Sequence, residues 1–201
     1  MSDATIAQQT GIPLPFVAGI RATESGGNSH ALRFEPHLFR RYHADCVRVL
    51  HPTEGAAFVT GDEERREAWA RGLVPYTPGK DRAASSSALE TGREAMEHAM
   101  RIDGNAAIRS TSFGSFQVLG AHLLPFGATP EAALAVFDAA PQSVSDELLV
   151  RWLRANTRAL DAAKAGEIDL FIHYYNGCAL DDTARYRKRF DPAYVKAGGK
   201  L

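Results

Sequence analysis

Glu24 is the residue in this chain whose type and placement best suit acid chemistry. It follows Val17 and Ile20 at helical spacing, so the three side chains share one stripe of a helix that starts near Pro15. The glycines at 26–27 can supply the left-handed turn that ends such a helix. A carboxyl group at the edge of apolar packing is partly desolvated, which favours the protonated form that a general acid needs. The alternative is a solvated glutamate near a helix end.

Glu24 belongs to the first of five short motifs that follow one another along the chain. The motifs are Glu-Ser-Gly-Gly at 24–27, Arg-Phe-Glu-Pro-His at 33–37, Ser-Phe-Gly-Ser-Phe-Gln-Val-Leu-Gly at 112–120, Tyr-Tyr-Asn-Gly at 174–177 and a basic, aromatic tail, Tyr-Arg-Lys-Arg-Phe, at 186–190. In this order the chain resembles the N-acetylmuramidase family of phage endolysins over nearly its whole length. It departs from the family at Phe113, where tryptophan is usual, at Ser115, where leucine is usual, and at Cys178 after the Asn-Gly pair.

The resemblance implies a mainly α, lysozyme-like helical fold with at most a small β-hairpin and a cleft between two lobes. It also implies a peptidoglycan hydrolase that cleaves the glycosidic bond between N-acetylmuramic acid and N-acetylglucosamine, with Glu24 as the general acid. We expect the enzyme to act without a cofactor.

Hydrolysis through an oxocarbenium-like transition state also needs a second carboxylate, acting as a nucleophile or as the base for water. Glu35 is the candidate that both its spacing from Glu24 and the family resemblance favour. Because Glu35 precedes Pro36, it can instead cap the helix that follows. Asp45 and Glu54 are alternative candidates.

Neutral polar and aromatic side chains suit a glycan site, because a sugar polymer offers hydroxyl and acetamido groups. The resemblance implies a substrate groove that includes Ser112, Phe113, Gln117, Tyr175 and Asn176. By local pattern alone, residues 113–117 are predicted to pack at a helix start. Residues 174–177 by themselves indicate a helix C-terminus with a glycine cap.

Helical patterns dominate the remaining sequence. They predict one helix from the capping box of Ser87 and Glu90 to Asp103-Gly104, one capped by Thr129 with Pro130 in first position, and a longer one from Ser143 or Ser145 to just before Gly166. Strand-like alternation is best at residues 32–34, so we expect at most a small hairpin between Gly26 and Pro36.

The composition fits one catalytic domain over residues 1–201, since 45% hydrophobic residues and a net charge of -1 allow a full core. Residues 51–86 differ in character and are predicted to be a loop-rich excursion over one side of the cleft. Trp69 and Tyr76 could stack on sugar rings there, although a lone tryptophan in a loop more often anchors the loop to the core.

Charge and cysteine content are also informative. Residues 185–201 carry six basic residues and one acidic residue, which predicts either a patch that binds an anionic cell wall or a solvated helix face.

Cys46 and Cys178 are too few for a disulfide framework, and we expect both to be reduced when the chain is made.

The sequence also suggests where the protein acts. Residues 1–10 lack the pattern of a secretory signal, and no apolar run approaches the length of a membrane span. We therefore expect synthesis in the cytoplasm and action on peptidoglycan in the periplasm or cell wall. A holin or a secretion machine would deliver the enzyme, which we expect to be a monomer. An immunity protein is a further expected partner if it is an antibacterial effector.

Three other functions are alternatives. A lytic transglycosylase would use the same acid but close an anhydro ring on muramic acid, and it can dispense with Glu35. A non-catalytic wall-binding module would not need Glu24. A zinc enzyme is disfavoured because His30, His37 and His43 do not have a recognised zinc spacing.

Overall fold

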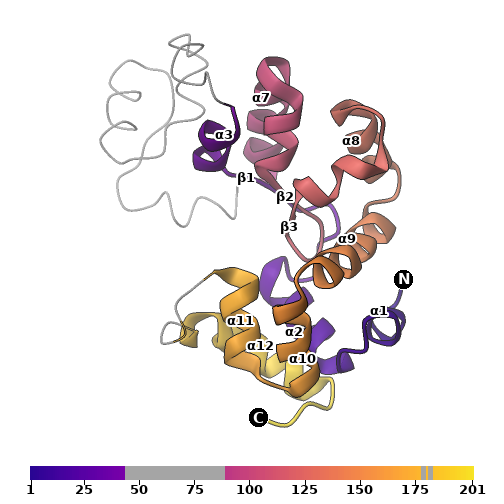
Figure 1. Cartoon of the computed structure of the whole chain (residues 1–201), viewed down its shortest axis with the longest axis vertical. Coiled ribbons are helices and arrows are strands. Elements are labelled where there is room, and N and C mark those ends of the chain that lie inside the picture. Colours follow the sequence, from indigo (N-terminus) through magenta and orange to yellow (C-terminus); the bar gives the residue numbers. More distant parts are fainter. Residues whose placement is uncertain (44–88, 178–179, 181–182) are drawn as a thin grey trace. The chain divides into compact units, whose positions relative to one another are not determined.

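The computed structural model describes residues 1–43, 89–177, 180 and 183–201 (Figure 1). In this part the chain is mainly helical with a small antiparallel sheet, which confirms the predicted fold class. Two compact units are present: Met1–His30 with Gly114–Val118 and Ala140–Leu201, here called unit 1, and Ala31–Phe113 with Leu119–Ala139, here called unit 2. The predicted excursion at 51–86, with Trp69 and Tyr76, lies outside the described residues, as do both cysteines.

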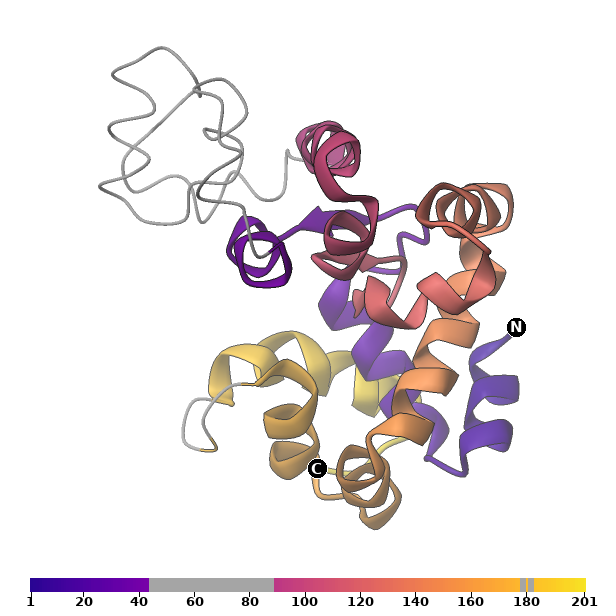
Figure 2. The same ribbon diagram turned by 45° about the horizontal axis from the view of Figure 1, so that its top comes forward.

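Unit 1 is built from helices. They are α1 (Asp3–Thr10), α2 (Leu14–Glu24), α9 (Pro141–Ala155), α10 (Thr157–Ala165), α11 (Ile168–Asn176) and α12 (Ala184–Lys196). Helix α2 packs on α1 and on α12, while α10 packs on α9 and α11. Figure 2 shows α12, in yellow, running beside α2, in violet.

Helix α2 confirms the predicted helix that carries Glu24. It starts after Pro13 and ends at Glu24, and Gly26 and Gly27 have positive φ values of 64° and 90°. The N–H of Gly27 donates to the carbonyl of Arg21 at 3.2 Å, which closes the end of the helix. The two glycines therefore stop the helix directly after the glutamate.

An aromatic cluster holds α2 against α11 and α12. The ring of Phe16 lies 5.4 Å from Phe171, 5.7 Å from Phe190 and 5.3 Å from Tyr194, measured between centroids. Gly19 permits this approach, because a Cβ atom there would lie only 2.5 Å from the ring of Phe190. The close packing brings α12 alongside the end of α2 that bears Glu24.

The longer helix predicted from Ser143 or Ser145 differs in two respects. It starts earlier, at Pro141, because proline lacks the N–H that a first helical residue would otherwise leave unpaired. It also breaks at Asn156, whose backbone leaves the helical region (φ -113°, ψ 71°), so that α9 and α10 are separate helices. The predicted stop at Gly166 is confirmed, since this glycine caps α10 with a φ of 78°.

Unit 2 combines a sheet with helices around it. It contains β1 (Leu32–Phe34), α3 (Pro36–Tyr42), α7 (Leu89–Arg109), β2 (Thr111–Phe113), the 3-10 turns η3 (Gly120–His122) and η4 (Leu124–Phe126), and α8 (Pro130–Ala139). Strand β3 (Val118–Leu119) lies where the chain passes between the units and gives the sheet order β1-β2-β3. Helix α7 contacts β1, β2, α3 and α8. The predicted cap of α8 is confirmed, because the Thr129 hydroxyl accepts the N–H of Ala132 at 3.2 Å.

The strand predicted at residues 32–34 is present, but the expected limit of a small hairpin between Gly26 and Pro36 is exceeded, because this strand belongs to a three-stranded sheet. Strand β1 pairs antiparallel with β2, in a register that places Leu32 opposite Phe113. Local alternation can identify a strand, but it cannot identify a partner that lies far along the chain. The same pairing corrects the helix start predicted for residues 113–117, which form the end of a strand and a turn.

Helix α7 continues past its predicted end at Asp103-Gly104. The backbone of Asp103 is non-helical (φ -153°, ψ 99°), so the helix does break there. The Asp103 side chain then accepts the N–H of Ala106 at 2.9 Å, and a second helical segment runs to Arg109. Ser87 of the predicted capping box lies outside the described residues.

Candidate active site

Glu24 lies at the C-terminal end of α2 and is partly buried. The hydroxyl of Tyr186, on α12, donates a hydrogen bond to Oε1 of Glu24 at 2.8 Å. Tyr186 is itself buried, with 8% of its surface exposed. Tyr186 therefore fixes one carboxylate oxygen of Glu24, in a setting that is partly shielded from water.

The turn at Gly114–Val118 packs against the same end of α2. The Ser25 hydroxyl, next to Glu24, donates to the carbonyl of Ser115 at 2.9 Å. Gly114 takes a left-handed conformation (φ 71°), and a Cβ atom there would meet Oγ of Ser145 at 2.4 Å. The lack of a side chain at Gly114 thus serves packing on α9 within unit 1.

Gln117, a predicted substrate-binding residue, lies in this turn. Its φ of 50° is the one positive value outside glycine among the described residues, a conformation that needs support from its surroundings. The side-chain amide donates to the carbonyl of Gly114 at 3.0 Å, which stabilises the turn from within. Gln117 is partly exposed.

Tyr175, on α11, contacts the same turn at Gly114–Val118. Its hydroxyl donates to the carbonyl of Phe116 at 2.5 Å, and its ring contacts Trp152 and Phe171. Burial of the phenol and the negative charge of Glu24 raise the pKa of Tyr175 well above its ordinary value of 10.0. The hydroxyl is therefore protonated at neutral pH, and the negative charge of Glu24 is close enough to interact with it.

Asn176 is the last residue of α11 and is exposed. Gly177 follows it with a φ of 70°, so the helix end with a glycine cap, predicted from the local pattern, is confirmed. Unit 1 thus brings Glu24, Gln117 and Tyr175 together around the turn, and it places Asn176 at the neighbouring helix end.

The other predicted site residues belong to unit 2. Ser112 and Phe113 lie in β2 and are 3% and 0% exposed, and the Phe113 ring packs on Phe137 at 5.1 Å. Both are therefore part of the interior of unit 2, and their assignment to substrate binding stays a prediction.

Glu35, the predicted second carboxylate, also belongs to unit 2. It occupies the N-cap position of α3, but its side chain makes no capping hydrogen bond. Instead, Oε1 pairs with Nε of Arg33 at 2.5 Å. The backbone N–H of Glu35 donates to the carbonyl of Ser110 at 2.7 Å, which ties it to the end of α7. Asp45 and Glu54 lie outside the described residues.

The sequence alone did not reveal the role of Tyr186. It appeared there only as part of a basic, aromatic tail, and its hydrogen bond to Glu24 joins residues 162 positions apart. The available signal was an aromatic residue four positions before Phe190, which places both on the buried face of α12. Among the described residues, no group of three or more His, Cys, Asp or Glu residues could hold a metal ion.

A family model described as Muramidase, N-acetylmuramidase, matches residues 13–198. The chain belongs to the N-acetylmuramidase family. This match covers each of the five motifs and both candidate carboxylates, and it makes the chain a glycoside hydrolase that acts on peptidoglycan.

The fold of this muramidase is similar to that of a solved phage protein, the endolysin of Burkholderia AP3 phage. The two share 21% sequence identity with a TM-score of 0.62, over 98% of this chain and 70% of the other. At that identity the likeness concerns the fold. No curated protein gives a significant match to the muramidase chain.

Proposed function

We propose that this muramidase cleaves the glycosidic bond between N-acetylmuramic acid and N-acetylglucosamine, with Glu24 as the general acid. The observation that carries this proposal is the placement of a partly buried glutamate at the end of α2, with a tyrosine hydroxyl 2.8 Å from its Oε1. The hydrogen bond fixes the orientation of the carboxyl group, which a general acid needs in order to direct its proton.

In the proposed reaction, Glu24 gives its proton to the glycosidic oxygen as the bond to the muramic acid anomeric carbon breaks. In one form of the reaction, water attacks this carbon directly; in the other, a carboxylate attacks first and forms a covalent intermediate that water then hydrolyses. In both forms, one proton of the attacking water goes to a carboxylate and the other stays on the new hydroxyl group. Glu35 is the proposed second carboxylate. Its ion pair with Arg33 holds the carboxyl group in a defined position within unit 2.

The same unit offers groups for the sugars next to the acid. Tyr175 uses its hydroxyl on the Phe116 carbonyl but keeps part of its surface exposed, which suits contact with a pyranose face. We propose that Gln117 and Asn176 supply hydrogen bonds to hydroxyl or acetamido groups, and that Ser112 and Phe113 act by shaping the sheet.

The lytic transglycosylase alternative gains support from one feature. Glu35 already has a structural position, at the N-cap of α3 with an ion pair to Arg33, so it has a reason to be present without catalysis. In that reaction the muramic acid 6-hydroxyl replaces water, and a second carboxylate is dispensable.

The test is digestion of purified peptidoglycan, with mass analysis of the products before and after borohydride reduction. Hydrolysis predicts reducing muramic acid ends, which borohydride converts to alcohols and so makes two mass units heavier. Anhydro-muropeptides as the main product would select the transglycosylase, and reducing N-acetylglucosamine ends would place the cut at the other glycosidic bond. The Glu24→Gln protein, checked for folding, is the matched control.

The proposal also covers where in the cell the enzyme is made and where it acts. No helix among the described residues combines the length and the apolar character needed to cross a bilayer. We propose that the enzyme is made in the cytoplasm and reaches peptidoglycan as a monomer, through a holin in phage lysis or a secretion machine in bacterial competition. An immunity protein would accompany the second route.

A further inference from the structure

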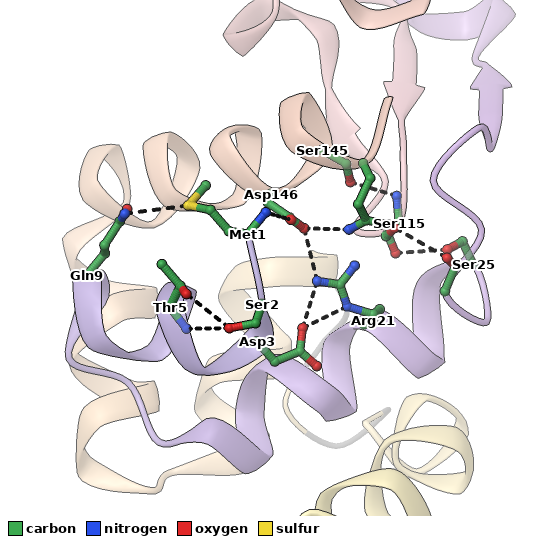
Figure 3. A network of polar contacts seen from close by, with 12 residues as sticks. Met1, Ser2, Asp3, Thr5, Gln9, Arg21, Ser25, Ser115, Ser145 and Asp146 are labelled. Carbon is green, nitrogen blue, oxygen red and sulfur yellow. Dashed lines mark hydrogen bonds and ion pairs between the residues drawn. The ribbon is translucent and has the colours of Figure 1, made fainter. Parts of the chain in front are cut away.

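A buried carboxylate, Asp146, lies close to the candidate site but has no part in the proposed chemistry. It is 0% exposed on α9 and accepts hydrogen bonds from Arg21 at 2.9 Å, from Gln142 at 2.8 Å and from the N-terminal ammonium of Met1 at 2.8 Å (Figure 3). A buried charge is costly unless it is paired and hydrogen-bonded, so this set of donors is what permits a carboxylate there.

Arg21 connects this carboxylate to the turn beside Glu24. It lies one helical turn before Glu24 on α2, with 17% of its side chain exposed. Its guanidinium also pairs with Asp3 at 2.7 Å, and Cζ lies 4.3 Å from the centroid of the Phe116 ring. Two carboxylates therefore fix the plane of the guanidinium, and that plane in turn supports the aromatic ring.

The turn at Gly114–Val118 is bound at several points, and two of them flank Glu24 in the sequence. Arg21 contacts Phe116 from one side, and the Ser25 hydroxyl donates to the Ser115 carbonyl at 2.9 Å from the other. The N–H of Ser115 donates to Oγ of Ser145 at 2.7 Å, and Ser145 directly precedes Asp146 (Figure 3). The turn is therefore held beside Glu24 by Arg21 together with Ser25 and Ser145.

We propose that Arg21 and Asp146 are positioning residues for the hydrolysis. As a buried pair they fix the turn, and with it Gln117 and the Phe116 carbonyl that anchors Tyr175, at a set distance from Glu24. Neither residue touches the substrate. The inference rests on the proposed function of Glu24, Gln117 and Tyr175.

The competing explanation is that the pair only stabilises the packing of α1, α2 and α9. The double variant Arg21→Met with Asp146→Leu separates the two explanations, because an apolar pair of similar volume often preserves or raises the stability of a buried site. It removes the guanidinium that supports Phe116, while Asp3 can turn to solvent. The Met1 ammonium and the exposed Gln142 amide also lose Asp146 as a partner, and both can turn to solvent. We expect a protein that is folded at the assay temperature, with a kcat on soluble peptidoglycan fragments that is lower by at least about tenfold.

A second variant keeps the test decisive if the double variant does not fold. Arg21→Lys keeps a cation for Asp146 and Asp3 but loses the planar group over Phe116. We expect it to fold and to show a lower kcat with a smaller change in KM. A parental kcat in either folded variant would overturn the positioning role.

The matched control is a more exposed ion pair elsewhere on the same helix, α9. Arg151 and Glu147 pair at 3.0 Å with side chains 39% and 35% exposed, so Arg151→Met with Glu147→Leu should leave kcat and KM unchanged. Glu24→Gln is measured alongside. An active Glu24→Gln protein refutes the proposed function, whereas an inactive one with parental Arg21 variants refutes only the positioning role.

Discussion

The position of the Glu24 side chain and of its surroundings is fixed by contacts from both near and distant parts of the chain. Its own helix supplies Arg21 and Ser25, which bind the Ser115–Phe116 part of the turn, while α12 supplies the hydroxyl of Tyr186. A general acid must hold its proton in a fixed direction, and each of these contacts restricts either the carboxyl group or its immediate surroundings.

The first prediction at the residue scale concerns the acid. Glu24→Gln keeps the size of the side chain and a hydrogen bond with Tyr186 but removes the transferable proton, so turnover should fall at least about a hundredfold. The measurement is muropeptide release from peptidoglycan, with circular dichroism to check the fold. Tyr186→Phe is the companion variant, and it should keep more activity because it removes only the hydrogen bond. Near-parental release by folded Glu24→Gln would exclude Glu24 as the acid.

A second prediction concerns Glu35, because a catalytic role and a structural role predict different effects of replacing it. If Glu35 is the second carboxylate, Glu35→Gln should abolish hydrolysis with little change in melting temperature. If it only forms the ion pair with Arg33 at the start of α3, the change should cost up to about 1 kcal/mol of stability and leave activity largely intact. Arg33→Gln removes the partner of the ion pair and serves as the control for that loss. An active but less stable Glu35→Gln protein would remove this residue from the catalytic mechanism.

At the scale of elements, Asp103 both breaks α7 and starts its second segment. Its side chain accepts the N–H of Ala106 at 2.9 Å and approaches Nδ1 of His43 at 2.9 Å. Partial burial alone would raise the pKa of Asp103, but the hydrogen bonds from Ala106 and His43 outweigh it and hold that pKa below its ordinary 3.8.

A third prediction follows for stability. Asp103→Ala should cost about 1 kcal/mol at neutral pH through loss of the cap, whereas Asp103→Asn should keep most of it, since asparagine also caps helices. Because the pKa of Asp103 is lower in the folded state, its charge stabilises the fold above pH 3.8, and this contribution is lost as pH falls through the folded value.

Urea unfolding of the three proteins at neutral and acidic pH measures both effects. The asparagine variant should lack the part of the acid sensitivity that Asp103 contributes. Equal midpoints for the alanine variant and the parent would show that the cap contributes nothing.

At the scale of the whole molecule, the net charge of -1 conceals an uneven distribution. Arg187 is paired with Asp169 and Asp191 at 3.0 Å, whereas Arg185 and Lys188 are exposed on α12. This local basic surface can attract an anionic cell wall although the molecule as a whole carries almost no net charge.

A fourth prediction tests this surface. Arg185→Glu with Lys188→Glu should reduce co-sedimentation with purified sacculi by about threefold or more at low salt, and the difference should shrink as salt rises. Arg154→Glu with Arg158→Glu changes the net charge by the same amount on exposed positions of α9 and α10. Equal losses for both pairs would attribute the effect to net charge and not to α12.

Much of the local structure, and the family, can be predicted from the amino-acid sequence. The end of α2 at Glu24, the cap at Thr129 and the glycine stops at Gly166 and Gly177 follow from side chains and backbone preferences within a few residues. Five motifs in order were enough to indicate the family, since each is a short string that needs no contact information. The roles of Glu24, of Glu35 and of the predicted glycan-binding residues remain predictions.

The tertiary structure decided what depends on contacts between distant residues. The pairing of β1 with β2, the hydrogen bond from Tyr186 to Glu24 and the burial of Asp146 beside Arg21 join residues far apart in sequence, 162 and 125 positions apart in the last two cases. Local patterns report how a segment folds against itself and which face it buries. Which partner meets that face is set by how the whole chain packs, and so the partners of Glu24 appear only in the folded molecule.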